Sequence, residues 1–215
     1  MKTYPLPDLN EPRKYKQKCG KIVDAAFPYE FYPTFHRYHF DMPQKIKKPQ
    51  TIFVGSMADM FGEWVPDEWI EEVFKACEAA PQHRYLFLTK NPRRYMELIN
   101  KGLLPIRSDN FWWGATANTP DDNYFYSFDP LWLNTFVSIE PMQEAFSSEM
   151  GKSVCWIIVG AETGNRKDKI IPKREWIKNI VNACRAVNVP VFLKNNLTDI
   201  WQEPLIQEFP WEGKS

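Results

Sequence analysis

The stretch TIFVGSMADMFGEW, residues 51–64, decides the interpretation of this chain. A short apolar run, 52–54, stops at Gly55 and gives way to small and polar residues, before Pro66 and Asp67 open an amphipathic pattern. This order is typical of a buried β-strand, a functional loop and a helix. The same order recurs along the chain, which predicts a fold built from repeated strand–loop–helix units.

Six such strands are expected. Their apolar runs do not alternate cleanly with polar residues, which is typical of strands buried on both faces of a parallel sheet. Helices are expected to begin near residues 66, 91 and 172, where proline and capping residues precede apolar stripes at helical spacing. The strands are expected at 51–55, 84–88, 111–115, 135–139, 154–159 and 189–193.

Two arrangements fit this pattern, an open doubly wound sheet and a complete or partial (β/α) barrel. The sequence has no GxGxxG, Walker loop or GxSxG motif, which removes the common nucleotide-binding and serine-hydrolase forms. We therefore predict an α/β fold with a partial (β/α) TIM-type barrel of parallel strands. One domain is expected, with an N-terminal arm and extended aromatic segment packing on the barrel at 1–50, the barrel at 51–197 and a tail at 198–215. Residues 1–19 of the arm are expected to be irregular and to lead into a weak helix.

Composition limits the function classes. The 215 residues are 44% apolar and 15% aromatic, which supports a substantial core. Lys and Arg balance Asp and Glu at 27 each, so no net charge attracts nucleic acid or an anionic membrane. No apolar run approaches the roughly 20 residues of a transmembrane helix, and the first residues lack a signal-peptide core. We expect a cytoplasmic chain with no membrane partner.

The cysteines lack the spacing of a metal site. Cys19, Cys77, Cys155 and Cys184 lie far apart, with no CxxC or CxxxC pair. Cys77 and Cys184 fall on apolar helix faces and Cys155 at the start of a strand, so these three are expected to be reduced core residues. Only Cys19, in a charged segment, is expected to be accessible.

Polar residues stand where each predicted strand ends. In a barrel these ends converge on one mouth, so their side chains are expected to face a common cavity. Glu140 follows the apolar run 136–139, and a carboxylate there must be paired or bind something, because leaving it buried alone costs on the order of several kcal/mol. The candidate catalytic residues are Glu140, Lys90 and Lys194, the candidate binding residues are Ser56, Asp59, Thr89, Thr116, Asn118, Glu162 and Thr163, and no metal ligand is predicted.

Some of these residues also suit plainer roles. Asp59 and Thr89 are good caps for a loop or for the following helix. Lys90 and Lys194 suit a solvated position as well as an inward one, where a lysine binds a carboxylate or phosphate.

Seven short motifs occur in order over about residues 30–197. They are YPTFH (32–36), FVGSMADMF (53–61), LTKNP (88–92), WGAT (113–116), SIEPM (138–142), WIIVGAETG (156–164) and PVFLK (190–194). Together they resemble a phage- and bacteria-encoded family of radical-SAM-like proteins whose function is unknown. The resemblance implies a partial (β/α) barrel and an N-terminal CxxxCxxC that holds a [4Fe–4S] cluster, at which S-adenosylmethionine is cleaved reductively to a carbon radical.

The chain departs from that family at the cluster motif. It contains no CxxxCxxC, and Cys19 alone cannot replace three thiolates. Its sequence begins about where the family's first strand and cluster loop should already have passed. Three explanations stay open: a truncated start, a cluster segment carried by a separate partner chain, or a member that has lost the chemistry. In this form the chain is not expected to be catalytically competent alone.

The resemblance also implies roles for the strand-end residues. S-adenosylmethionine is the implied cofactor, and the substrate is unknown. The loop GAETG with Glu162 resembles one that lies near the adenosyl group. Ser56, Thr116 and Glu140 would contact the methionine or ribose portion, and Lys90 and Lys194 would bind its carboxylate or the substrate.

Two other function classes remain open. A barrel that binds a nucleotide or single-stranded nucleic acid would use Lys90, Arg93 and Arg94 together with exposed tryptophans. A metal-independent lyase or hydrolase would use Glu140 and Glu162 as an acid/base pair.

Overall fold

The computed structural model describes residues 6–25, 28–30, 32–105, 108–122, 134–147 and 154–212. The chain forms two compact units. The first contains Met1–Gln50 and Pro66–His83, and the second contains Thr51–Val65 and Arg84–Ser215. The helix that follows the strand beginning at Thr51 therefore belongs to the same unit as the N-terminal segment. All six strands of that sheet belong to the second unit.

The N-terminal part of the first unit contains short strands, so the expected weak helix is wrong. β2 (Lys14–Lys16) and β3 (Ile22–Asp24) form an antiparallel hairpin, and β1 (Asp8–Leu9) pairs in parallel with β4 (Phe35–His36). Gly20 lies in the hairpin turn with a φ of 87°, a conformation that favours glycine. β2 and β3 pair across a turn, and β1 pairs with β4 from a distant part of the chain, so local helix propensity registers neither pairing.

The first unit also contains η1 (Arg37–His39), α1 (Met42–Lys45) and α2 (Asp67–Glu78). Asp67 and Glu68 occupy the first turn of α2, where negative charge interacts favourably with the helix dipole. The Phe35 ring stacks on Trp69 with centroids 4.4 Å apart. Ion pairs from Arg37 to Asp8 and to Glu72 tie the N-terminal strands to α2.

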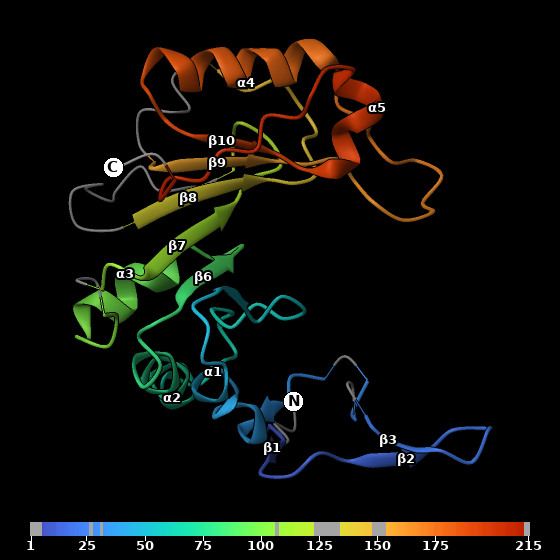
Figure 1. Cartoon of the computed structure of the whole chain (residues 1–215), viewed down its shortest axis with the longest axis vertical. Helices are drawn as coiled ribbons and strands as arrows, with labels where there is room; N and C mark the ends of the chain where they lie inside the picture. The colour runs from blue at the N-terminus through green and yellow to red at the C-terminus, as the bar shows by residue number, and fades with distance from the viewer. Residues whose placement is uncertain are drawn as a thin grey trace. The chain divides into compact units, whose positions relative to one another are not determined.

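The second unit is built on a six-stranded parallel sheet that forms a half-barrel, which confirms the predicted α/β fold class (Figure 1). Strands adjacent in the sheet are also consecutive in the chain, in the order β10-β9-β8-β7-β6-β5. Their carboxyl ends therefore lie along one edge of the sheet, which we call the carboxyl edge. The strands are β5 (Thr51–Val54), β6 (Arg84–Thr89), β7 (Phe111–Thr116), β8 (Asn134–Ile139), β9 (Trp156–Val159) and β10 (Val191–Leu193).

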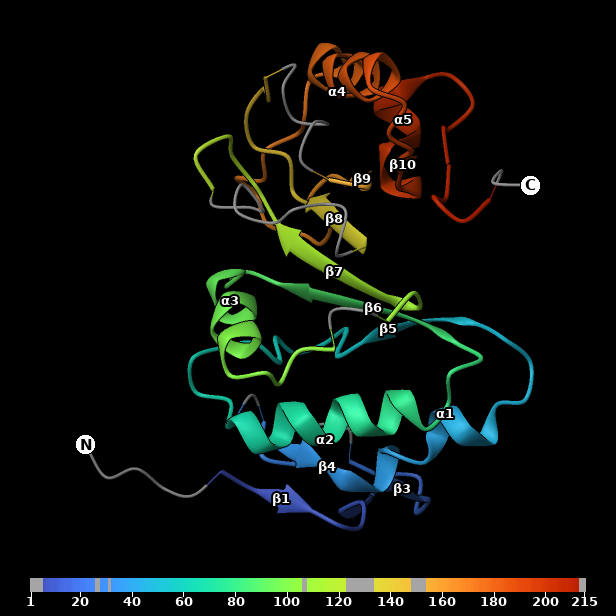
Figure 2. The same cartoon turned by 90° about the vertical axis from the view of Figure 1, so that its left-hand side faces the viewer.

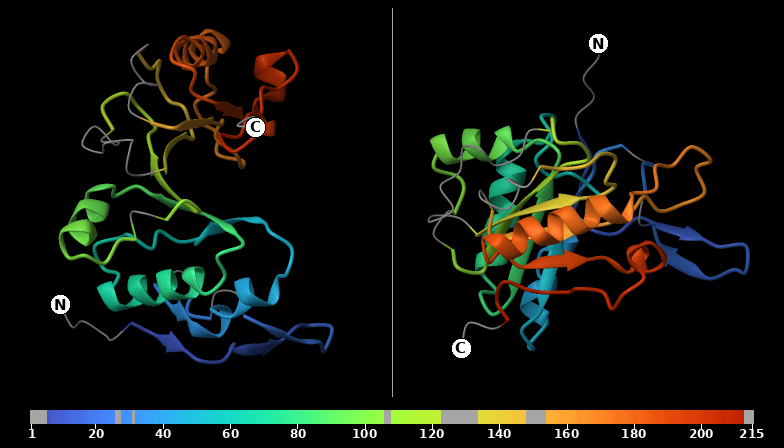
Figure 3. Two further views of the ribbon diagram at one scale, coloured as in Figure 1. Left: turned by 60° about the vertical axis from the view of Figure 1, so that its left-hand side comes forward. Right: turned by 90° about the horizontal axis from the view of Figure 1, so that it is seen from above.

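Helices cover one face of this sheet. α4 (Arg174–Ala186) lies beside β9 and β10, and α3 (Arg93–Asn100) lies beside β6 and β7 (Figures 2 and 3). Tyr95 of α3 donates a hydrogen bond to the Gly114 carbonyl at 3.0 Å and packs on the Trp113 ring. The chain then turns through η3 (Asn195–Leu197) into α5 (Thr198–Trp201). In the part of the chain that the structure describes, no helix is both long and apolar enough to cross a membrane.

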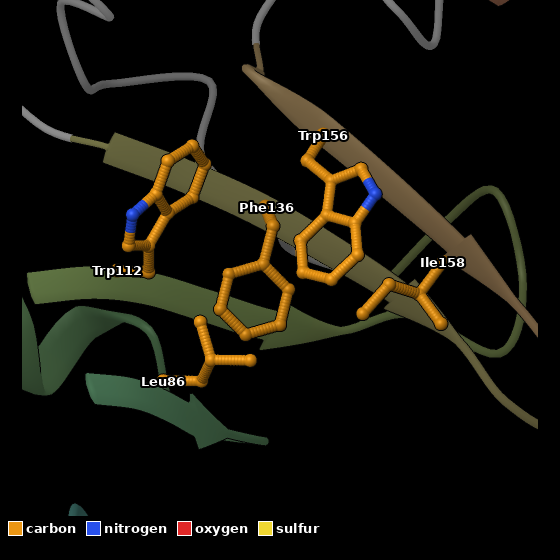
Figure 4. Packing of buried hydrophobic residues seen from close by; sticks show 5 residues of the cluster. All are labelled: Leu86, Trp112, Phe136, Trp156 and Ile158. Carbon is orange, nitrogen blue, oxygen red and sulfur yellow. The ribbon is translucent and has the colours of Figure 1, made fainter. Parts of the chain in front are cut away.

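The opposite face carries an aromatic cluster, because alternate residues of a strand point to opposite sides. We call it the aromatic face. Gly114 lies under the Phe136 ring, so closely that a Cβ at this position would be 2.2 Å from Phe136 Cζ. Glycine at 114 thus lets the ring lie flat on β7. The buried members of the cluster are Leu86, Trp112, Phe136, Trp156 and Ile158 (Figure 4).

The C-terminal segment packs on this aromatic face. Residues 206–208 run antiparallel beside β10, with a hydrogen bond of 2.7 Å from the Leu193 N–H to the Ile206 carbonyl. The Trp211 ring contacts Trp112 and Trp156, each with centroids 5.3 Å apart. The Arg84 guanidinium lies 4.0 Å from the centroid of the Trp211 ring. The C-terminal segment therefore covers the aromatic face near the first residues of β6, β7 and β9. Trp211 does not lie at the carboxyl edge of the sheet.

Candidate functional site

All ten candidate residues follow strands of the half-barrel or end them, so they lie along its carboxyl edge. Five of them fall into two groups, one joined by a side-chain contact and one that lines a pocket. One group, which we call the β8–β10 cluster, contains Glu140 and Lys194. The other lines a pocket after β6 and β7 and contains Lys90, Thr116 and Asn118.

The β8–β10 cluster is centred on the carboxylate of Glu140. Lys194 Nζ donates to Glu140 Oε2 in an ion pair, and Asn196 Nδ2 donates to Glu140 Oε1 at 3.3 Å. The side chains of Glu140 and Lys194 are 26% and 41% exposed. The carboxylate is therefore paired, as its position after an apolar strand required, and it stays accessible to a ligand.

Gly160 provides the surface on which Glu140 lies. A Cβ built at this position would be 2.7 Å from Glu140 Oε1, a distance that real side chains do not tolerate. The backbone also links the two strand ends, since the Gly160 N–H donates to the Ile139 carbonyl at 2.9 Å. A glycine directly after β9 is thus part of the geometry that orients the carboxylate.

Asn196 belongs to this cluster, although the sequence did not single it out. Its Oδ1 accepts the Ala161 N–H at 3.1 Å, and its Nδ2 donates to the Ala161 carbonyl at 2.7 Å. One amide side chain thus holds both backbone groups of Ala161 and one oxygen of Glu140. The signal in the sequence was an asparagine pair just after a predicted strand. Asparagine is so common in turns that such a pair does not identify a functional residue.

Glu162 and Thr163 lie further along the loop after β9. Glu162 forms an ion pair with Arg166 at 3.0 Å, and Thr163 is exposed. Glu140 and Glu162 thus each have their own cation. This arrangement does not favour the acid/base pair that a lyase or hydrolase would need.

A pocket of about 380 Å³, the β6–β7 pocket, opens beside the ends of β6 and β7. The structure adds five lining residues to the candidates, all from loops or from the start of α3. Of these five, the sequence had indicated only Arg93, and only for binding of a nucleic acid. The complete lining consists of Glu63, Lys90, Asn91, Pro92, Arg93, Thr116, Asn118 and Asp122.

Asp59 and Thr89 support the backbone around this pocket. Asp59 accepts the N–H groups of Phe61 at 3.0 Å and of Lys90 at 2.8 Å, which joins the loop after β5 to the end of β6. Thr89 is buried, and its hydroxyl accepts the Asn91 N–H at 2.9 Å. These contacts match the capping role that the sequence allowed. Ser56 is exposed in the turn after β5 and, like Asp59 and Thr89, does not line the pocket.

The cysteines differ in accessibility. Cys77 and Cys184 are buried and Cys19 is exposed, as expected, whereas Cys155 is only partly buried. Burial raises the pKa of the Cys77 and Cys184 thiols to about 12 in each case. In the described ranges, no three His, Cys, Asp or Glu side chains are placed to hold a metal ion.

These differences predict selective alkylation. Iodoacetamide at pH 8 should modify Cys19 first, because it is exposed, while Cys77 and Cys184 should react only after unfolding. Mass spectrometry of peptides from native and urea-treated protein measures this order. Alkylation of Cys77 at the rate of Cys19 in the native protein would contradict the burial described here.

Comparison with models of protein families gave one match. The family is described as Protein of unknown function (DUF5131), and its model matches residues 12–203. This range includes every residue of the β8–β10 cluster and of the β6–β7 pocket. No curated protein and no solved structure matched the chain.

Proposed function

The chain belongs to the DUF5131 family, whose function is unknown, and we propose that it is a radical-SAM-type protein that binds S-adenosylmethionine at the carboxyl edge of its half-barrel. The observation that carries this proposal is the convergence of polar groups there. Cations, carboxylates and amides from successive strand ends lie along one edge of a parallel sheet. S-adenosylmethionine combines an ammonium, a carboxylate, a sulfonium and a nucleoside, so its recognition needs groups of both charges.

Each group at the edge has a part in this proposal. The loop 160–164 with Glu162 lies where the adenosyl group would bind, and Glu140 faces the ribose or methionine portion together with Ser56 and Thr116. Lys90 and Lys194 bind the carboxylate or the substrate. The pair formed by Glu140 and Lys194 is suited to orienting a polar ligand, because both heads are partly exposed.

An iron–sulfur cluster does not fit the described residues. Burial raises the pKa of two of the four cysteine thiols, and no three ligand side chains converge in the described part of the chain. S-adenosylmethionine would supply a carbon radical only when a cluster is present, so no radical step is assigned to this chain by itself. The proposal therefore needs a cluster-binding segment from outside these 215 residues, and a separate partner chain is one possible source of it.

Binding of S-adenosylmethionine to the purified chain tests the proposal. Titration calorimetry should give saturable binding, weakened about tenfold in Glu140→Gln and in Gly160→Ala, because a charge-assisted contact is lost or displaced. Lys48→Met, at an exposed lysine of the first unit, is the matched control and should bind normally. A folded protein that binds neither S-adenosylmethionine nor 5′-methylthioadenosine would refute the proposed function.

A further inference from the structure

We infer that the β6–β7 pocket binds an amino-acid group, with separate sites for its α-carboxylate and its α-ammonium. The inference rests on the proposed function only in naming S-adenosylmethionine as one source of that group. A free amino acid is the other source. The pocket volume of about 380 Å³ is within the range of small-ligand sites.

One side of the pocket is suited to a carboxylate. Lys90 and Arg93 line it, and neither has an ion-pair partner among the residues that the structure describes. Lys194 of the neighbouring cluster, by contrast, is already paired with Glu140. Arg93 opens α3, whose first turn contains no acidic residue, so the helix dipole adds to the positive potential. The Thr116 side chain is a further hydrogen-bond donor in the lining.

The other side is suited to an ammonium. Asp122 Oδ2 accepts the N–H groups of Asn118 at 2.5 Å and of Thr119 at 3.0 Å, which fixes the carboxylate. Asp122 Oδ1 accepts no hydrogen bond from the described residues. An ammonium has three N–H donors for such acceptors.

The balance of charge favours a zwitterion over a simple anion. The lining carries two cations, Lys90 and Arg93, and two carboxylates, Glu63 and Asp122. A phosphate would be attracted by the first pair and repelled by the second. A ligand with both charges complements all four of these residues.

Titration calorimetry with four probes, one of which is inorganic phosphate, tests this inference. S-adenosylmethionine and L-methionine contain the amino-acid group, and 5′-methylthioadenosine lacks it. Lys90→Met and Asp122→Asn should each weaken the binding of S-adenosylmethionine about tenfold. Neither variant should change the binding of 5′-methylthioadenosine. Asn at 122 keeps a carbonyl acceptor for the two backbone N–H groups, so this variant should fold. Glu63→Gln removes the other carboxylate of the lining and gives a second variant of that charge, and Lys48→Met is the control.

The outcomes separate the inference from the proposed function. If L-methionine binds and S-adenosylmethionine does not, the inference stands and the proposed function fails. If S-adenosylmethionine binds equally well to all variants, the proposed function stands and the inference fails. Absence of binding by both amino-acid probes overturns the inference. It is also overturned if inorganic phosphate binds and Asp122→Asn strengthens that binding, because the pocket is then an anion site.

Discussion

Trp156→Ala should lower the free energy of unfolding by about 3–5 kcal/mol, because it removes the central ring of the aromatic face. Trp156 is 2% exposed, and its Nε1 donates to the Glu208 carbonyl at 2.9 Å. The substitution leaves a cavity and an unpaired carbonyl, and it removes the ring contacts between Trp156 and the C-terminal segment. Urea denaturation followed by circular dichroism measures the change. The rings that Trp156 contacts are Trp112, Phe136, Phe192, Phe209 and Trp211.

Trp64→Ala is the matched control for this prediction. Trp64 is 58% exposed, so its loss should change the unfolding free energy by no more than about 0.5 kcal/mol. Equal effects of the two substitutions would show that the aromatic face is not a packed core.

Gly114→Ala should destabilise the protein by about 3 kcal/mol, although it adds only one methyl group. The new Cβ would lie 2.2 Å from Cζ of Phe136, and that ring is fully buried, so it has no free space to move into. The ring or β7 must shift, which disturbs packing on both neighbouring strands. Chemical denaturation of the variant and the parent protein gives the difference.

A second substitution distinguishes this clash from any other destabilising effect of alanine at position 114. In a Phe136→Leu background the obstructing ring is gone. Gly114→Ala should therefore lower the free energy of unfolding much less in this background than in the parent protein. Equal costs in the two backgrounds would mean that the contact between Gly114 and Phe136 is not the cause.

Local sequence patterns were sufficient to predict parallel strands with helices between them, whereas the choice of a partial barrel over an open sheet depended on the absence of nucleotide-binding and hydrolase motifs. Apolar runs at β6 and β8 marked strands, and Asn91, Pro92 and Gly102 marked the limits of α3 within a few residues. The hairpin of β2 and β3 was missed because its stability comes from pairing across a turn. Strand and helix signals are properties of short segments, whereas pairing is not.

The candidate site was predictable only in part. A polar residue after a buried strand must be satisfied, and this rule selected Glu140 before its partners were known. The rule could not select Arg93, Glu63 or Asp122, because each lies in a loop or at a helix start, where polar residues are ordinary. It also assigned a ligand role to Asp59, whose carboxylate accepts backbone N–H groups.

The sequence by itself determined the order and the direction of the strands, and hence that their polar ends share one edge. Hydrophobic periodicity and turn residues act over a few neighbours, so they are readable without coordinates. Only the tertiary structure decided which side chains meet there. Lys194 reaches Glu140 from 54 residues away, and Trp211 covers the aromatic face from the end of the chain. Such contacts depend on where the connections between strands place distant residues relative to one another. Local sequence patterns contain no information on these positions.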